Sequence, residues 1–177
     1  MKRLDALALT GLLAQQAYVL ATVPLAALHA TEPTTIATVA SAIVTAALVA
    51  SLFSSALASL RRLQLALFLG GMPIIYAWCA LLRGDTSALA IESIGLVVFG
   101  GLAIAGYLRV PLLLGVGIIA HGVAWDAWHH GHSSYVPDWY SAGCLVADLG
   151  IGLFALSYLA PLARSRLIPP PPPSPRR

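Results

Sequence analysis

Most of the side chains in this sequence that can bind a metal or transfer a proton lie in one stretch of its last third. The stretch reads His121-Gly-Val-Ala-Trp-Asp126-Ala-Trp-His129-His130-Gly-His132, and Cys144-Leu-Val-Ala-Asp148 follows it. Imidazole and carboxylate groups are ligands that divalent transition metals accept in proteins. The surrounding sequence is mostly Ala, Leu, Val, Ile and Gly, where polar groups are costly, so their presence indicates a functional site.

A metal-assisted site can be assembled from these groups together with Glu92 of an earlier apolar segment. We predict metal ligands at His121, His129, His130 and Asp148, and catalytic carboxylates at Asp126, Asp148 and Glu92. One carboxylate would act as a general base, and a carboxylate that binds no metal would orient an imidazole. The sequence names no cofactor; a divalent transition metal such as zinc or iron is the candidate.

Helical phase favours convergence of these groups on one wall. At ~100° per residue, His129 points between His121 and Asp126, whereas His130 lies further round the helix. Cys144 lies one turn from Asp148 on the same face of the next helix and is a further candidate ligand. We therefore expect one shared cavity that opens to the external side of a membrane.

Other readings of the same residues stay open. His129, His130 and His132 also suit an interfacial loop, in an aromatic belt with Trp125, Trp128, Tyr135, Trp139 and Tyr140. His121 and Asp148 also suit a buried hydrogen bond between helices, although an ionised carboxylate at that depth costs ~2.5–3.5 kcal/mol, which favours function. A disulfide between Cys79 and Cys144, both near the outer surface, would remove Cys144 from a metal shell.

Composition places the chain in a membrane, because 59% of its 177 residues are hydrophobic and only 10% are charged. A bilayer core requires roughly 20 apolar residues per helix. Six runs meet this length, at 6–28, 35–60, 63–82, 87–108, 110–128 and 142–162. The predicted fold is all-α: a polytopic transmembrane bundle of six helices over residues 1–165, followed by a disordered proline-rich tail over 166–177.

The distribution of positive charge orients this bundle. Cytoplasmic loops collect Lys and Arg, and an even number of spans with both termini cytoplasmic leaves only Arg83 outside. The cytoplasmic set is Lys2, Arg3, Arg61, Arg62, Arg109, Arg164, Arg166, Arg176 and Arg177. We predict a multi-pass protein of the inner (plasma) membrane. The first segment, which resembles a secretory signal, is expected to be a retained helix.

The expected partners follow from this location. Membrane lipid and a lipid-like small molecule are expected, and nucleic acid is not, because no basic surface carries interleaved aromatic residues. Glycines on the predicted helices, Gly100, Gly101, Gly143 and Gly150, would line close helix contacts within the chain or between copies in a homo-oligomer.

The pattern HG-x-x-WD-x-x-HH, then VP-x-WY, then C-x-x-x-D resembles that of small uncharacterised polytopic bacterial integral membrane proteins. It covers about the last third of the transmembrane region, and the residues concerned are Asp126, His129, His130, Val136, Pro137, Trp139, Tyr140, Cys144 and Asp148. The resemblance implies no established activity, only that these residues act as a unit; a bacterial origin is suggested by the Ala-, Leu- and Arg-rich composition. The repeated histidine boxes of membrane desaturases and hydroxylases are missing, which argues against that class.

Two function classes remain. The first is a membrane-embedded, metal-assisted enzyme that acts near the outer leaflet on a lipid-like or isoprenoid-like substrate. The second is a small transporter, a pH or ion sensor, or an accessory subunit without catalysis, in which the same groups bind an ion or titrate. The sequence leaves open whether the protein is an enzyme.

Overall fold

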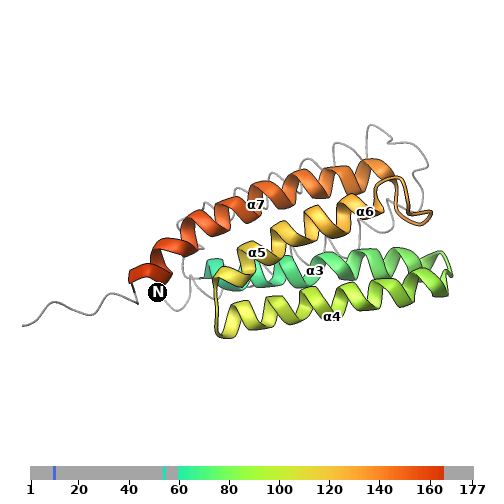
Figure 1. Ribbon diagram of the computed structural model, residues 1–177. Coiled ribbons are helices and arrows are strands. Elements are labelled where there is room, and N and C mark those ends of the chain that lie inside the picture. The colour runs from blue at the N-terminus through green and yellow to red at the C-terminus, as the bar shows by residue number, and fades with distance from the viewer. Residues whose placement is uncertain (1–9, 11–53, 55–59, 166–177) are drawn as a thin grey trace, which may run out of the picture.

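The computed structural model of the chain describes Thr10, Ser54 and residues 60–165, with the backbone alone for 162–165 (Figure 1). The predicted spans at 6–28 and 35–60 lie outside the described residues except for Thr10, Ser54 and Leu60. The predicted tail at 166–177 lies outside them as well.

The described part is helical and contains no strand. Its elements are α3 (Arg61–Leu82), α4 (Thr86–Leu108), α5 (Leu112–Ala120), the π-helical turn η2 (His121–Asp126), α6 (Ala127–His129) and α7 (Asp138–Ser165). The predicted spans at 63–82, 87–108 and 142–162 correspond to α3, α4 and α7. The predicted span at 110–128 corresponds to α5, η2 and α6 in succession. Helix α7 begins four residues before its predicted span, because Asp138 is already helical.

Three of the described helices, α3, α4 and α7, are long and apolar enough to cross a membrane. Their outer surfaces carry large apolar side chains, including Ile94, Val97, Ile104, Val146 and Leu153, each more than 60% exposed. A water-soluble chain rarely exposes so much apolar surface, whereas lipid covers it without cost. The protein is therefore a membrane protein.

Short turn signals set where these helices begin and end. Gly84, with φ of 67°, follows α3, and Gly131, with φ of 76°, follows α6; both conformations suit glycine because it lacks a Cβ. The Asp85 carboxylate accepts the Ala88 N–H at 2.9 Å and caps α4. Pro111 stands at the start of α5, where its missing N–H costs no helical hydrogen bond.

The helices run alternately up and down and create two distinct ends (Figure 1). We call the end with the α3–α4 turn at 83–85 and the α6–α7 loop at 130–137 the loop end. We call the end where α3 begins at Arg61 and α4 ends before Arg109 the arginine end. The two ends differ in chemistry, as described below.

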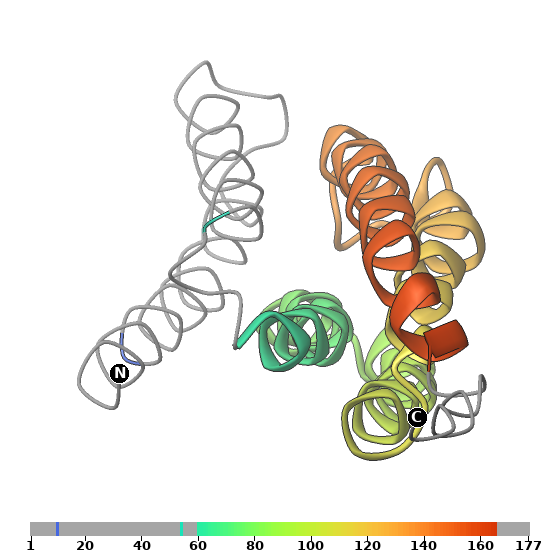
Figure 2. The same ribbon diagram turned by 90° about the vertical axis from the view of Figure 1, so that its left-hand side faces the viewer.

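Two helix pairs build the bundle: α3 packs against α4, and α5 with η2 packs against α7 (Figure 2). Near the arginine end the core is aliphatic; it includes Leu65, Leu69, Leu114, Ile118, Ile151 and Leu159. Toward the loop end it becomes aromatic and polar, with Tyr76, Cys79, Tyr135, Val136 and Tyr140. The chemistry-bearing residues lie at that second end.

Glycines allow the close approach of α5 and η2 to α7, but they are not the predicted ones. A Cβ on Gly152 would lie 2.5 Å from Ile119 Cγ1, and one on Gly115 would lie 2.8 Å from the Leu156 side chain. At the predicted contact positions Gly100, Gly101, Gly143 and Gly150, a Cβ would meet no atom of the described residues within 4 Å. The prediction that these glycines line contacts within the described bundle is therefore wrong.

Candidate functional site

The π-helical turn η2 brings His121 and Asp126 together. In an α-helix, residues five apart diverge by about 140° around the axis. In a π-helix the hydrogen bonds span five residues, so such residues lie nearly above one another. Here the Ala127 N–H donates to the Gly122 carbonyl, five residues back. As a result, His121 Nδ1 lies 3.4 Å from Asp126 Oδ1, and both side chains are fully buried.

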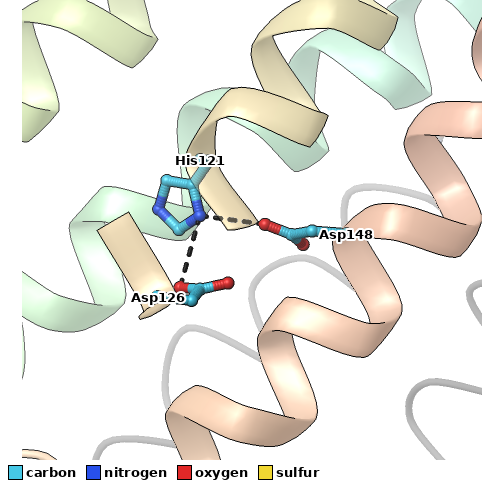
Figure 3. Close-up of side chains that lie close together, drawn as sticks. All are labelled: His121, Asp126 and Asp148. Atoms are coloured by element: carbon cyan, nitrogen blue, oxygen red, sulfur yellow. Dashed lines mark hydrogen bonds and ion pairs between the residues drawn. The ribbon is translucent and has the colours of Figure 1, made fainter. Parts of the chain in front are cut away.

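Asp148 enters the same space from α7. Its Oδ2 lies 2.9 Å from His121 Nδ1 (Figure 3). Gly122 makes this approach possible, because a Cβ at that position would lie 2.8 Å from the Asp148 Cβ. Helix α7 therefore reaches η2 at this level only because residue 122 has no side chain.

Tyr76 of α3 adds a fourth side chain to the cluster, from a third element. Its hydroxyl donates to Asp126 Oδ1 at 2.7 Å, and its side chain is 1% exposed. A hydroxyl in this position holds the carboxylate and leaves the second oxygen, Oδ2, directed elsewhere. We call His121, Asp126 and Asp148, with Tyr76 beside them, the His121 cluster.

The His121 cluster has the geometry of a metal site. One ligand atom from each of His121, Asp126 and Asp148 can be chosen so that all three lie within 4.8 Å of one another. Ligand atoms around a tetrahedral ion with metal–ligand distances of ~2.0–2.2 Å stand about 3.4 Å apart. From His121 Nδ1, the distance of 3.4 Å to Asp126 Oδ1 equals that value, and the distance of 2.9 Å to Asp148 Oδ2 is shorter.

The same cluster contains buried polar atoms without partners. His121 Nε2 and Asp126 Oδ2 are both buried and make no hydrogen bond. Buried polar groups are nearly always satisfied, so atoms of this kind point to a missing ligand. The atoms at metal-like spacing are His121 Nδ1 and one oxygen each of Asp126 and Asp148; a nitrogen with carboxylate oxygens suits a divalent transition metal, so these residues fit such an ion.

A second cluster lies closer to the end of the bundle and joins α4, η2, α6 and the loop. Glu92 Oε1 lies 2.7 Å from His129 Nε2 and accepts the Tyr135 hydroxyl. Glu92 Oε2 accepts the Trp125 Nε1–H at 3.1 Å. Both Glu92 and His129 are fully buried. We call these four residues the Glu92 cluster.

The Glu92 cluster is internally satisfied, and its hydrogen bonds fix the placement of one proton. His129 Nδ1 donates to the Trp125 carbonyl at 2.7 Å. Because a carbonyl only accepts, Nδ1 carries a hydrogen. The 2.7 Å contact between Nε2 and Glu92 Oε1 is a second hydrogen bond of the same imidazole.

Tyr135 ties the 130–137 loop to this cluster. Its side chain is 6% exposed, and its hydroxyl lies 3.1 Å from His129 Nε2 as well as bonding Glu92. Burial, followed by the hydrogen bond to Glu92, raises the pKa of the Tyr135 phenol well above its ordinary value. The hydroxyl therefore stays protonated and remains a hydrogen-bond donor.

Tyr76 lies between the two clusters. Its ring centroid is 4.3 Å from that of His129 and 5.9 Å from that of His121, while its hydroxyl bonds Asp126. Phe99 of α4 packs edge-on against the His121 ring at 4.8 Å. The two clusters are thus neighbours inside one aromatic interior.

The structure sorts the predicted site residues into three groups. His121, Asp126 and Asp148 lie together, and Glu92 lies with His129. His130 is apart from both: it is exposed, and its Nδ1 donates to the Asp138 carbonyl at 3.2 Å. We expected His129 to line the same cavity as His121 and Asp126, and it does not. The π turn rotates Asp126 toward His121, whereas the His129 imidazole is hydrogen-bonded to Glu92.

The cysteines and the expected aromatic belt also find their places. Cys79 and Cys144 are both free thiols, and Cys144 packs beside the aromatic cluster rather than among the candidate ligands. Three of the belt residues, Trp125, Tyr135 and Tyr140, turn inward instead and pack in the core or bond Glu92. Trp128 is exposed and stacks with His132 at the loop end.

Sequence reasoning missed Tyr76 and the polar role of Tyr135. The signal for Tyr76 was its hydroxyl, which lies within a largely apolar part of α3. Burying a hydroxyl in a membrane helix costs free energy unless it is hydrogen-bonded, so a partner could have been expected. Tyr135 was expected in a loop at the level of the lipid headgroups. Only the fold shows that this loop turns inward and buries the side chain. No protein-family model, curated protein or solved structure matches this chain.

Proposed function

We propose that this protein is a metal-dependent enzyme of the inner membrane, with its site toward the external face and a lipid-like or isoprenoid-like substrate. The single observation that carries the proposal is the His121 cluster: three buried ligand groups at metal-like spacing, with two buried polar atoms left unpartnered. Such a cluster is expensive in a membrane interior unless it binds something.

The topology belongs to the same proposal. The chain forms six membrane helices with both termini in the cytoplasm, and the loop end then faces outward because the arginines gather at the opposite end. The His121 cluster lies among helices whose outer faces are apolar. An apolar substrate would reach it from the surrounding lipid.

Each residue has a role in this scheme. His121, Asp126 and Asp148 hold the ion, and Tyr76 orients Asp126 through its hydroxyl. A bound divalent ion supplies a Lewis acid and activates water. The hydrogen-bonded Glu92–His129 pair accepts or returns a proton during turnover.

A metal analysis of the purified full-length protein tests the proposal. After loading with zinc and removal of free metal, wild type retains a stoichiometric amount, whereas His121→Ala and Asp148→Asn lose it. His130→Ala is the matched control, because that imidazole is exposed and lies outside both clusters. Wild-type protein that holds no more metal than folded His121→Ala would refute the metal site.

A second candidate function is supported by the 2.9 Å contact between His121 Nδ1 and Asp148 Oδ2, which is a complete hydrogen bond without any ion. In that case the cluster binds a proton, and the protein is a small transporter, a pH or ion sensor, or an accessory subunit. This alternative predicts a metal-free wild type whose tryptophan fluorescence changes with pH, and a folded His121→Ala variant that has lost the change.

A further inference from the structure

Two adjacent arginines at the start of α3 are engaged in different ways. Arg61 and Arg62 carry the same charge and are both half-buried at the arginine end. Neither forms a salt bridge within the described residues. Their hydrogen bonds and ring contacts separate a structural role from a binding role.

Arg62 is used by the fold. Its Nε and Nη2 donate to the Gly106 carbonyl at 3.3 Å and 3.0 Å, and its guanidinium lies 5.7 Å from the Tyr107 ring centroid. Gly106 is in the last turn of α4, where carbonyls lack helical partners. Arg62 therefore ties the start of α3 to the end of α4.

Arg61 is held in place but is not satisfied. Its guanidinium carbon lies 4.5 Å from the Tyr158 ring centroid and 5.9 Å from that of Phe154, both on α7. These two rings stack nearly parallel, at 8°, and form a flat support. The Arg61 Nε is buried and has no hydrogen-bond partner. An oriented guanidinium with an unmet donor is prepared for an anionic ligand.

Among the described residues, no acidic side chain lies at the arginine end. Helix α3 begins here without a capping side chain and without an acidic residue in its first turn, so the positive end of its dipole adds to the arginine charge. Arg109 is exposed at the same end. The acidic residues of the described part all lie toward the loop end or beyond the middle of the bundle: Asp85, Glu92, Asp126, Asp138 and Asp148.

We propose that Arg61 binds the phosphate of an anionic phospholipid. A membrane-spanning helix begins at this residue, which places the guanidinium at headgroup depth. The stacked rings of Phe154 and Tyr158, which lie partly exposed on α7 beside the guanidinium, form an apolar surface against which an acyl chain can lie. A free phosphate ion would use the guanidinium but gain nothing from that apolar surface.

Lipid binding to the full-length protein tests this assignment. Native mass spectrometry with phosphatidylglycerol and with phosphatidylcholine gives the preference for the anionic lipid, and thermal unfolding with each lipid and with inorganic phosphate gives the stabilisation. Removing a charge-assisted contact weakens binding about tenfold. We expect Arg61→Gln to bind phosphatidylglycerol about tenfold more weakly and to lose its preference over phosphatidylcholine. Arg83→Gln, at the loop end, is the matched control and should keep the wild-type preference.

Further variants keep the test decisive. Arg61→Lys retains the charge and the stem but not the planar fork, so it should fold and show a smaller loss. Arg62→Gln should lower the unfolding temperature in either lipid while keeping the preference. Equal losses in Arg61→Gln and Arg83→Gln, wild-type preference in both Arg61 variants, or equal stabilisation by inorganic phosphate would each overturn the proposal.

Discussion

At the scale of single residues, the two buried clusters differ in how completely their polar atoms are paired. In the Glu92 cluster, Trp125, Tyr135 and His129 all meet the carboxylate, and the other His129 nitrogen bonds a carbonyl. In the His121 cluster, His121 Nδ1 is hydrogen-bonded to Asp148, whereas His121 Nε2 and Asp126 Oδ2 have no hydrogen-bond partner. A fully paired network chiefly rigidifies a fold, whereas an incompletely paired one is where a ligand gains most.

Tyr76 offers a test of the His121 cluster that changes no candidate ligand. Tyr76→Phe removes the donor to Asp126 Oδ1 and keeps the ring between His121 and His129. Metal affinity should fall about tenfold, in line with other changes beside metal ligands. A competition titration with a chelating dye measures it.

The control for this variant is Tyr107→Phe, because Tyr107 is exposed at the arginine end. That variant should bind metal as wild type does. An unchanged metal affinity in folded Tyr76→Phe would show that Asp126 does not depend on the hydroxyl.

Tyr135 gives a prediction about stability and pH. Tyr135→Phe should destabilise the protein by about 1–3 kcal/mol near neutral pH, because the buried Glu92 carboxyl loses a donor. The pKa of this phenol is raised in the folded protein above its ordinary value of 10.0. The stabilisation is therefore fully present below pH 10 and is lost as the pH rises further, since the unfolded chain ionises first.

The difference in unfolding free energy between wild type and Tyr135→Phe should thus be constant to about pH 10 and shrink above it. Denaturant unfolding in detergent at several pH values measures this. A difference that widens above pH 10 would mean that the phenol ionises more readily in the folded protein than in the unfolded chain.

At the scale of elements, the π turn and one glycine assemble the His121 cluster. Helix α5 could continue as an α-helix into α6, but η2 interrupts it and rotates Asp126 toward His121. Gly122 then lets α7 approach until Asp148 reaches the same imidazole. The site therefore depends on backbone spacing as much as on its ligands.

Gly122→Ala tests this dependence. The added Cβ would lie 2.8 Å from the Asp148 Cβ, so α7 must move away. We expect a loss of about 1–3 kcal/mol in stability, as for other overpacked contacts, together with loss of bound metal. Thermal unfolding and metal analysis measure the two effects.

Gly143→Ala is the matched control on α7, since a Cβ there meets nothing within 4 Å. It should leave metal content unchanged and stabilise the helix slightly, by about 0.4–1 kcal/mol. If Gly122→Ala kept both stability and metal, the close approach of α7 would not be needed for the site.

At the scale of the whole molecule, the bundle is polarised along its length. Its buried carboxylates and histidines lie toward the loop end, while Arg61, Arg62 and Arg109 lie at the arginine end. In the proposed topology, the loop end faces the outside because positive charge favours the cytoplasmic side. The proposed metal site and the proposed phospholipid site would then serve opposite leaflets.

Reporter fusions test this orientation. A reporter joined after Ser134, in the loop before α7, should be external, and one joined after Arg177 should be cytoplasmic. An enzyme that is active only outside and a fluorescent protein that is fluorescent only inside give complementary readouts. Both junctions on the same side would contradict the proposed topology.

The sequence alone determined that the protein lies in a membrane and where the described helices run. The span at 87–108, for example, differs from α4 by one residue, because apolar length, Gly84 and Pro111 are local signals that need no knowledge of the fold. Local composition also located the region of the site, since histidines and carboxylates are rare in apolar helices.

Only the tertiary structure decided which of those residues meet. A uniform α-helical phase predicted that His129 lies beside His121. In the structure the π turn brings Asp126 to His121, and His129 is hydrogen-bonded to Glu92 of a different helix. Tyr76 joined the site from a segment that showed no polar pattern. These pairings depend on distances between helices, which Gly122 and the packing of α7 set, and no spacing along a single helix encodes them.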